Sequence, residues 1–142
     1  MLDFVLLTKI WLVGFGLNII WEFAHCQLYE TCRRQPWRRL VPLLVPMAGK
    51  DGLIIVMFYM AAAWLWRSAV IVDSVPALIF FVVISLGFAF IDETISLRWK
   101  RWGYAAAMPT IGGVGLTPLL EIALTGLATL LIIFGLPGSN GV

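Results

Sequence analysis

The stretch NIIWEFAHCQLY, residues 18–29, decides how this chain is arranged. It closes the first apolar segment. At about 100° per residue, its polar members Asn18, Glu22, His25 and Tyr29 fall within a sector of roughly 60° on a helix. Hydrocarbon offers no hydrogen-bond partners, so a polar stripe on a membrane-length helix must face protein or a wet cavity. The first helix therefore has an inner face, and we expect the rest of the chain to be arranged against it.

Composition places the 142-residue chain among membrane proteins. Hydrophobic residues make up 61% of it and charged residues 13%, whereas soluble domains average about 45–50% and about 25%. The mean hydropathy is +0.96. A formal net charge of +2 is too small to indicate a nucleic-acid partner. We therefore expect membrane lipids and a lipophilic small molecule as partners and no nucleic acid, while the sequence leaves the oligomeric state open.

Four segments reach the length of about 20 residues that a helix needs to cross a bilayer, and they are about 5–29, 52–72, 75–97 and 111–136. The sequence thus predicts an all-α, polytopic membrane protein, a single transmembrane domain over residues 1–142 with four helices in a bundle. Residues 31–50 are first basic and then apolar, and Pro42 and Pro46 interrupt the apolar part. We interpret this segment as a short interfacial or re-entrant element between the first two helices.

The basic residues predict an orientation. Only two of the ten lysines and arginines, Lys9 and Arg67, fall on one side of the predicted bundle. The others flank the two longer loops on the opposite side: Arg33, Arg34, Arg38, Arg39, Lys50, Arg98, Lys100 and Arg101. The positive-inside rule then places these loops in the cytoplasm and both termini outside, in a multi-pass protein of the cell inner membrane.

The two cysteines do not predict a special site. Cys26 and Cys32 are six residues apart, about 120° from sharing a face of one helix, so we expect no disulfide between them. The single histidine and the carboxylates show no zinc-like spacing along the chain. The sequence accordingly predicts no metal site and no cofactor.

With this topology, ionisable side chains from all four predicted helices fall on the cytoplasmic side: Glu22, His25, Asp51, Glu93 and Glu121. Asp51 has an alternative role as a helix N-cap, Glu93 as an interfacial charge, and Glu121 as a buried acid hydrogen-bonded between helices. Glu22 is the hardest to explain structurally. A carboxylate about two turns inside a bilayer costs at least about 2.5 kcal/mol on insertion scales, and intramembrane acids are therefore functional by default.

Glu22 and His25 lie one helical turn apart, close enough to share a proton. Such a pair suits general acid/base chemistry on an apolar substrate, and it equally suits proton coupling in a carrier. If the protein is an enzyme, we expect Glu22 to be the acid or base and His25 its partner. Glu93, Asp51 and Glu121 would then orient the reacting groups or relay the proton.

The motifs of this chain resemble those of a group of small, uncharacterised four-helix bacterial membrane proteins. The likeness covers most of the chain and rests on Asn18-x-x-Trp21-Glu22, Gly49-Lys50-Asp51-Gly52, Glu93, Trp102-Gly-Tyr104, Met108-Pro109 and Pro118-Leu-Leu-Glu121. The chain departs from the group near His25 and at Glu121, where the group has Gln, and at Lys50, where the group has Gly. The resemblance implies a four-helix fold and brings no assigned activity.

A shorter likeness is to the membrane-integral terpene cyclases, whose catalytic helix also carries Asn-x-x-Trp-Glu. Only Asn18, Trp21 and Glu22 match, and those enzymes have more helices. This resemblance implies that Glu22 acts as an acid on an isoprenoid-like substrate. Trp21 would help to hold a cationic intermediate by cation–π attraction. The residues expected to contact the substrate are Asn18, Trp21, Tyr29, Trp102 and Tyr104.

Three functions are therefore consistent with the sequence. The first is an intramembrane acid/base enzyme, an isomerase or a terpene-type cyclase. The second is a small proton- or cation-coupled transporter similar to the four-helix drug exporters, which use one glutamate in their first helix. The third is a non-catalytic membrane subunit whose polar stripe binds another membrane protein. Those exporters often insert in both orientations, which the uneven distribution of basic residues here disfavours.

The predicted orientation can be tested with accessible tags. Tags at both termini should be reached from the outer face of sealed cells, whereas tags within residues 31–50 and 99–110 should be protected, because basic loops are retained inside. Labelling with a membrane-impermeant reagent measures this. A population labelled equally at both sets of positions would contradict a single orientation and favour the transporter.

Overall fold

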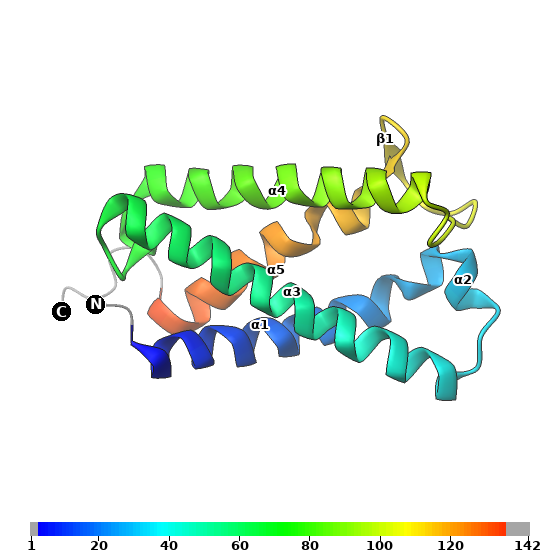
Figure 1. The fold of residues 1–142 in the computed structure, drawn as a ribbon, viewed down its shortest axis with the longest axis horizontal. Helices are drawn as coiled ribbons and strands as arrows, with labels where there is room; N and C mark the ends of the chain where they lie inside the picture. The colour runs from blue at the N-terminus through cyan, green and yellow to red at the C-terminus, as the bar shows by residue number, and fades with distance from the viewer. Residues whose placement is uncertain (1–2, 136–142) are drawn as a thin grey trace.

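The computed structural model describes residues 3–135 as an antiparallel bundle of four long helices (Figure 1). Each is long and apolar enough to cross a membrane. Their bounds are α1 (Phe4–His25), α3 (Trp37–Trp66), α4 (Val75–Arg98) and α5 (Leu116–Phe134). Short elements connect them: η1 (Cys26–Leu28), α2 (Glu30–Arg33), η2 (Ile71–Asp73), β1 (Thr110–Ile111) and β2 (Val114–Gly115). The predicted all-α class with four spanning helices is confirmed.

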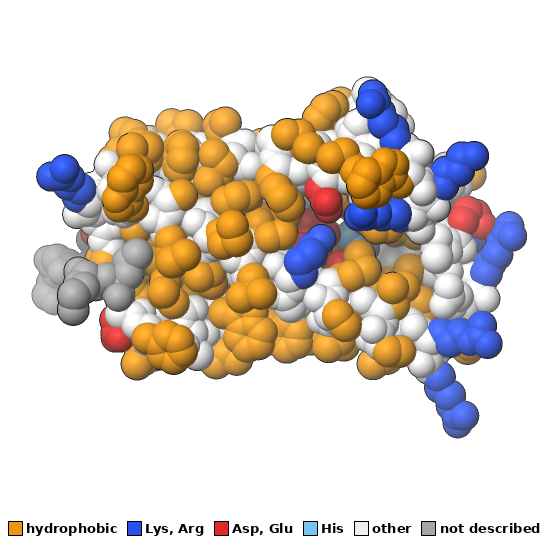
Figure 2. All heavy atoms as spheres, viewed as in Figure 1, with side chains coloured by type: hydrophobic (Ala, Val, Ile, Leu, Met, Phe, Trp, Pro, Cys, Tyr) orange, Lys and Arg blue, Asp and Glu red, His pale blue; other side chains and the backbone are white. Residues whose placement is uncertain are grey.

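The chain enters α1 and leaves α5 at one end of the bundle, which also holds the α3–α4 connection (Figure 1). The opposite end, here called the loop end, carries η1, α2, the residues that follow α4, and the β1–β2 hairpin. Most of the lysines and arginines visible in Figure 2 lie toward the loop end, while orange hydrophobic side chains are spread along the length of the face shown, with white backbone and other side chains between them.

The bounds of the second spanning helix differ most from prediction. It covers Trp37–Trp66 in place of about 52–72, so the segment predicted to be interfacial or re-entrant forms α2 and the beginning of α3. Pro42 and Pro46 lie inside the helix, each removing one backbone hydrogen bond. The helix continues through them because Leu40 and Leu44, one turn apart, are buried in a cluster at the loop end. This cluster comprises Cys26, Tyr29, Cys32, Leu40, Leu44 and Met108.

Asp51 therefore lies within a continuous helix and is not an N-cap, and η2 occupies the segment predicted to end the second helix. The first helix also ends earlier than predicted. Tyr29, expected on that helix, has an extended backbone (φ −109°, ψ 132°) and forms a β-bridge with Tyr104.

The expectation of no disulfide is wrong, because Cys26 and Cys32 are bonded. The expectation assumed one continuous helix through both residues. In the structure α1 stops at His25, and the chain turns at Tyr29 before α2 begins, which brings the two Cα atoms within 5.7 Å.

The third spanning helix lies within one residue of its predicted bounds, whereas the fourth starts five residues later than predicted, at Leu116. Residues 110–115 instead form the β1–β2 hairpin, with Thr110 opposite Gly115 and Ile111 opposite Val114. Gly112 and Gly113 form its turn at φ values of 59° and 83°, which suit glycine. The predicted last residue of this helix, 136, lies outside the described residues.

A continuous apolar core fills the half of the bundle away from the loop end. Its largest fully buried members come from all four helices and η2: Ile10, Ile55, Tyr59, Ile71, Phe81 and Leu130. The ring of Phe81 packs directly against the backbone of α5, where a Cβ atom placed at Gly126 would lie 2.5 Å from Cζ of Phe81. The close contact between α4 and α5 in this half therefore depends on a residue without a side chain.

Gly126→Ala should lower the stability of the bundle by about 1–3 kcal/mol, the usual range for overpacking a dense core. Thermal unfolding in detergent measures this. Gly87→Ala on α4 is the matched control, since nothing lies within 4 Å of a Cβ atom there. The control should leave stability unchanged or raise it by up to about 1 kcal/mol. Equal effects of the two substitutions would contradict the packing described here.

Candidate functional site

The loop half of the bundle contains a cavity of about 470 Å³. In Figure 2 it is a hollow between α3 and α4, with acidic side chains and the histidine visible inside and lysine or arginine side chains beside it. All five ionisable residues singled out from the sequence line it: Glu22, His25, Asp51, Glu93 and Glu121. Each has only 3–7% of its surface exposed. The structure thus brings these side chains from four helices to one buried place, while their chemical roles stay predictions.

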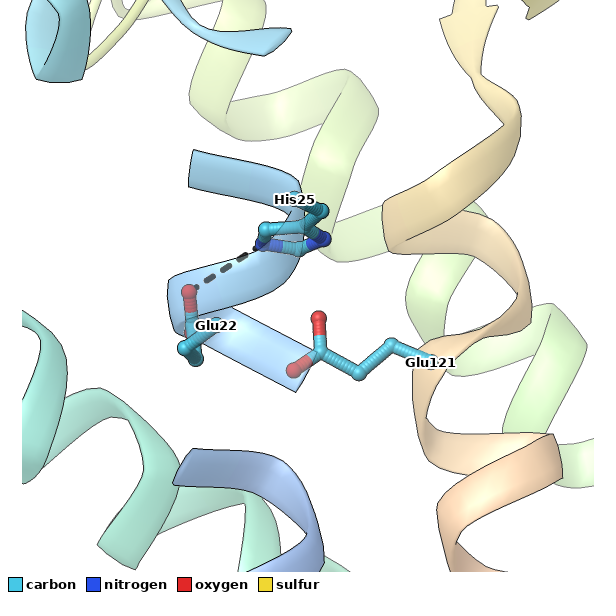
Figure 3. Close-up of side chains that lie close together, drawn as sticks. All are labelled: Glu22, His25 and Glu121. Atoms are coloured by element: carbon cyan, nitrogen blue, oxygen red, sulfur yellow. Dashed lines mark hydrogen bonds and ion pairs between the residues drawn. The ribbon is translucent and has the colours of Figure 1, made fainter. Parts of the chain in front are cut away.

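Three of these side chains meet on the floor of the cavity (Figure 3). His25 Nε2 lies 3.1 Å from Glu22 Oε2, and Glu121 extends from α5 toward this pair. One nitrogen or oxygen atom from each of the three residues lies within 4.8 Å of the other two. These atom types bind metal ions as well as protons, so the cluster has the donors for either chemistry.

A hydrogen bond one turn deeper explains why Glu22 faces Glu121. Thr125 Oγ1 lies 3.0 Å from Asn18 Oδ1, which connects α5 to α1, and 2.7 Å from the backbone oxygen of Glu121, so its one hydrogen is shared between these two acceptors. Because the two helices are antiparallel, four residues forward on α1 and four residues back on α5 are the same step toward the loop end. That step leads from Asn18 to Glu22 and from Thr125 to Glu121. The Asn18–Thr125 pair therefore sets the register that brings the two carboxylates together.

Two polar atoms in this cluster are buried without a hydrogen-bond partner among the described residues. They are Oε1 of Glu121 and Nδ1 of His25. Such groups are uncommon in folded proteins, because an unpaired buried polar atom loses the hydrogen bonds that it made to water. Both atoms are consequently available to a substrate, a water molecule or an ion in the cavity.

Glu93 has a different environment. Its Oε1 accepts hydrogen bonds from Tyr104 Oη at 2.6 Å, Trp102 Nε1 at 3.0 Å and Tyr29 Oη at 3.4 Å. Tyr104 in turn accepts a hydrogen bond from the backbone N–H of Gly115 at 2.7 Å. Glu93 therefore holds the loop after α4 and the start of α5 against the end of α1, so its oxygen is occupied by structural partners.

The mouth of the cavity is bordered by an ion pair between helices. Lys50 Nζ on α3 lies 3.6 Å from Asp51 Oδ1 on the same helix and 3.6 Å from Asp92 Oδ2 on α4. Apolar side chains line the walls below this level: Leu43, Leu44, Met47, Phe88, Ala89 and Ile122. The cavity is therefore amphipathic, with charge at its mouth and floor and hydrocarbon between them.

Of the five residues predicted to contact substrate, Tyr29 and Trp102 line the cavity. Asn18, Trp21 and Tyr104 are not part of its wall. Asn18 is fully buried between α1 and α5, donating to Gly14 O as well as accepting from Thr125. Trp21 packs edge-on against the His25 ring, with centroids 6.2 Å apart. These side chains support the site from behind and do not face a substrate in the cavity.

Sequence reasoning missed several residues that line the cavity: Cys26, Cys32, Arg39, Lys50, Asp92 and Arg101. In the sequence Lys50 and the arginines indicate an orientation, and Lys50 also belongs to the Gly49–Gly52 motif, but neither feature predicts that they line a cavity. Lys50 could have been predicted to line the cavity only if the second spanning helix had been given its true bounds, since Lys50 and Asp51 are then neighbours inside one helix. The cysteines gave no signal, because their approach depends on the turn at Tyr29.

No protein-family model matches the chain, and no curated protein or solved structure shows significant similarity to it. The resemblances drawn from the Asn18–Glu22 motif therefore stay predictions. The geometry of the cavity is what supports a function.

The two tyrosines that contact Glu93 lie beyond the spanning segments, and both have altered acidity. Burial, followed by the nearby Glu93 charge, raises the pKa of Tyr29 far above its ordinary value of 10.0. Burial and the hydrogen bond to Glu93 raise the pKa of Tyr104 above the same value. Both phenols consequently stay protonated in the folded protein at pH values where they ionise in the unfolded chain.

Tyr104→Phe should lower stability by about 1–3 kcal/mol, because the Gly115 N–H and Glu93 each lose a buried partner. The loss should shrink as the pH rises above about 10. In that pH range Tyr104 ionises in the unfolded wild-type chain but not in the folded protein. Ionisation therefore lowers the free energy of unfolding of wild type, whereas the variant has no hydroxyl group to ionise at this position. Thermal melting of both proteins near pH 8 and near pH 11 checks this, and a difference that stays constant with pH would contradict it.

Proposed function

We propose that this chain is an intramembrane enzyme that performs acid/base catalysis on a lipophilic, isoprenoid-like substrate, as an isomerase or a cyclase. The observation that carries the proposal is the meeting of Glu22, His25 and Glu121 on the buried floor of an amphipathic cavity. A proton donor and a proton acceptor held one turn apart in an apolar wall can transfer a proton to and from a hydrocarbon group. Membrane lipids surround the bundle, so such a substrate is already dissolved next to the site.

Within this proposal, Glu22 donates or removes the proton and His25 exchanges it. Their 3.1 Å separation permits direct transfer. Glu121 approaches from α5 and has an unpartnered oxygen, so it can receive the proton released at a second position or stabilise a developing positive charge. Asp51 and Lys50 at the mouth orient the polar end of the substrate. Glu93 positions the aromatic residues that close the loop end.

A proton- or cation-coupled transporter is supported less well by the packing. A carrier must open a route from its binding site to each face of the membrane in turn. Here the half of the bundle beyond the cavity is filled by fully buried side chains from several elements, among them Ile10, Ile55 and Phe81. A non-catalytic subunit is disfavoured for another reason, since the polar residues of α1, Asn18, Glu22 and His25, are buried inside the bundle and present no polar surface to a second membrane protein.

The orientation we propose places the loop end in the cytoplasm and both termini outside the inner membrane, as the eight basic residues favour. The Cys26–Cys32 bond lies at the same end, and disulfides are rare in a reducing cytoplasm. The two features indicate opposite sides of the membrane. We base the proposed orientation on the distribution of basic residues, because it involves eight of the ten lysines and arginines of the chain. The tag-accessibility experiment described above tests it.

Glu22→Gln should preserve the fold, because the amide keeps the shape of the side chain and removes a buried ionisable group. Thermal stability in detergent should hold or rise slightly. Glu93→Gln is the matched control: it weakens charge-assisted hydrogen bonds from three donors and should lower the melting temperature. An unfolded Glu22→Gln protein would indicate a structural role for Glu22.

Activity can be read from the lipids that copurify with each protein. Isomerisation and cyclisation leave mass unchanged, so substrate and product differ in chromatographic retention but not in mass. Glu22→Gln should slow the reaction by about 10²–10⁴-fold and retain the substrate, whereas wild type retains the product or neither. Chromatography with mass spectrometry compares the two extracts. Identical bound lipids in wild type and variant would contradict the proposed reaction.

A further inference from the structure

We propose that Glu22, His25 and Glu121 bind one divalent transition-metal ion, Zn²⁺ or Mn²⁺, on the floor of the cavity. The first observation is their convergence. One donor atom from each residue lies within 4.8 Å of the others, and His25 Nε2 and Glu22 Oε2 are already 3.1 Å apart. Ligand atoms around a tetrahedral zinc ion lie about 3.4 Å apart, given bond lengths near 2.1 Å. The carboxyl group of Glu121 points from α5 toward the other two side chains (Figure 3).

The second observation is independent of the first. Glu121 Oε1 and His25 Nδ1 are buried without a hydrogen-bond partner among the described residues, and their side chains lie in this cluster. Both residues have over nine-tenths of their surface buried, with 6% and 7% exposed. A lone pair held away from water and from every donor is what a metal ion requires of a ligand. Coordination of a metal gives the lone pair of Glu121 Oε1 a partner, and with Nε2 of His25 as a ligand, Nδ1 carries the hydrogen of the neutral imidazole.

Charge balance gives a third reason. Glu22 and Glu121 face each other in an apolar interior, where two ionised carboxylates repel strongly. Lys50, a basic side chain that lines the cavity, is engaged by Asp51 and Asp92. Two carboxylates and a neutral imidazole around a divalent cation sum to zero charge. The ion therefore removes the repulsion without leaving a net charge in the bundle.

The mixture of donors selects the kind of metal. An imidazole nitrogen favours zinc, copper, iron or nickel over magnesium and calcium, which prefer oxygen ligands alone, and the two carboxylates also suit manganese. Three protein ligands leave at least one position open, which is typical of catalytic and not of structural zinc sites. The sequence predicted no metal site because spacing along one helix cannot reveal a ligand on another. The third ligand, Glu121, comes from α5, about a hundred residues after the first two.

This inference goes beyond the proposed function and does not depend on it. A divalent ion lowers the pKa of a bound water molecule, so in the metal-bound protein that water would take over the proton transfer assigned above to the Glu22 carboxyl. Metal binding can be measured without any substrate.

The test uses full-length protein in detergent, stripped with EDTA and titrated with ZnCl₂ by isothermal calorimetry. Wild type should bind one Zn²⁺ per chain. Glu121→Gln and His25→Ala should each weaken binding by more than about 100-fold, since the loss of outer partners alone costs 10–100-fold. Glu30→Gln is the matched control, because this half-exposed acid pairs with Arg34, does not line the cavity and should leave affinity unchanged. Equal affinity in Glu121→Gln and wild type would overturn the site.

A spectroscopic measurement on wild type keeps the test decisive if a variant fails to fold. Co²⁺ in place of Zn²⁺ should give the intense visible absorption of a four- or five-coordinate site, and one equivalent of Zn²⁺ should abolish it. Weak absorption typical of six-coordinate Co²⁺ would overturn the inference. Failure here leaves the acid/base proposal intact if Glu22→Gln still alters the bound lipids. If metal binds and those lipids do not change, the proposed reaction fails and the metal site stands.

Discussion

The fold depends on how ionisable side chains are accommodated inside an apolar bundle. A carboxylate in hydrocarbon is costly, so each must find a partner, a cavity or a cation. The Asn18–Thr125 hydrogen bond sets the register between α1 and α5, and the step of one turn from it brings Glu22 and Glu121 face to face. Without this register the two acids would lie at different depths in the bundle, and each would need a separate partner, cavity or cation. With it they line one cavity and lie close to one another.

The two halves of the bundle differ in how they are packed. The half away from the loop end is closely packed, to the point that a single methyl group at Gly126 would meet the Phe81 ring. The loop half is held open by polar contacts at its end, where Glu93 gathers Tyr29, Trp102 and Tyr104. The backbone adds two further connections: Glu30 N–H donates to Gly103 O, and Ala105 N–H donates to Leu28 O. A rigid closed half and a tied loop end allow the cavity between them to stay hollow.

The sequence predicted the features that follow from local physics. Apolar segment lengths gave four helices, and the 3.6-residue period gave the inner face of α1, whose buried residues include Gly14, Asn18, Glu22 and His25. Features that depend on contacts between distant segments were not predictable. Pro42 and Pro46 suggested a break, but burial of Leu40 and Leu44 keeps α3 continuous. The disulfide needed the turn at Tyr29, and the approach of Glu121 needed the register between two helices, neither of which spacing reveals.

Glu93 and Glu121 show how a structural acid differs from one available for chemistry. Both are buried to a similar degree, at 4% and 6% exposed, and both line the same cavity. Burial alone therefore does not separate them. Glu93 accepts hydrogen bonds from three side chains, Tyr29, Trp102 and Tyr104, so a change at this carboxyl group would disturb the fold of the loop end. Glu121 has an oxygen without a partner, and a change in what that oxygen binds disturbs nothing else. The number of hydrogen-bond partners that each acid already has, and not its depth, is why we propose Glu22, His25 and Glu121, and not Glu93, for the chemistry of this cavity.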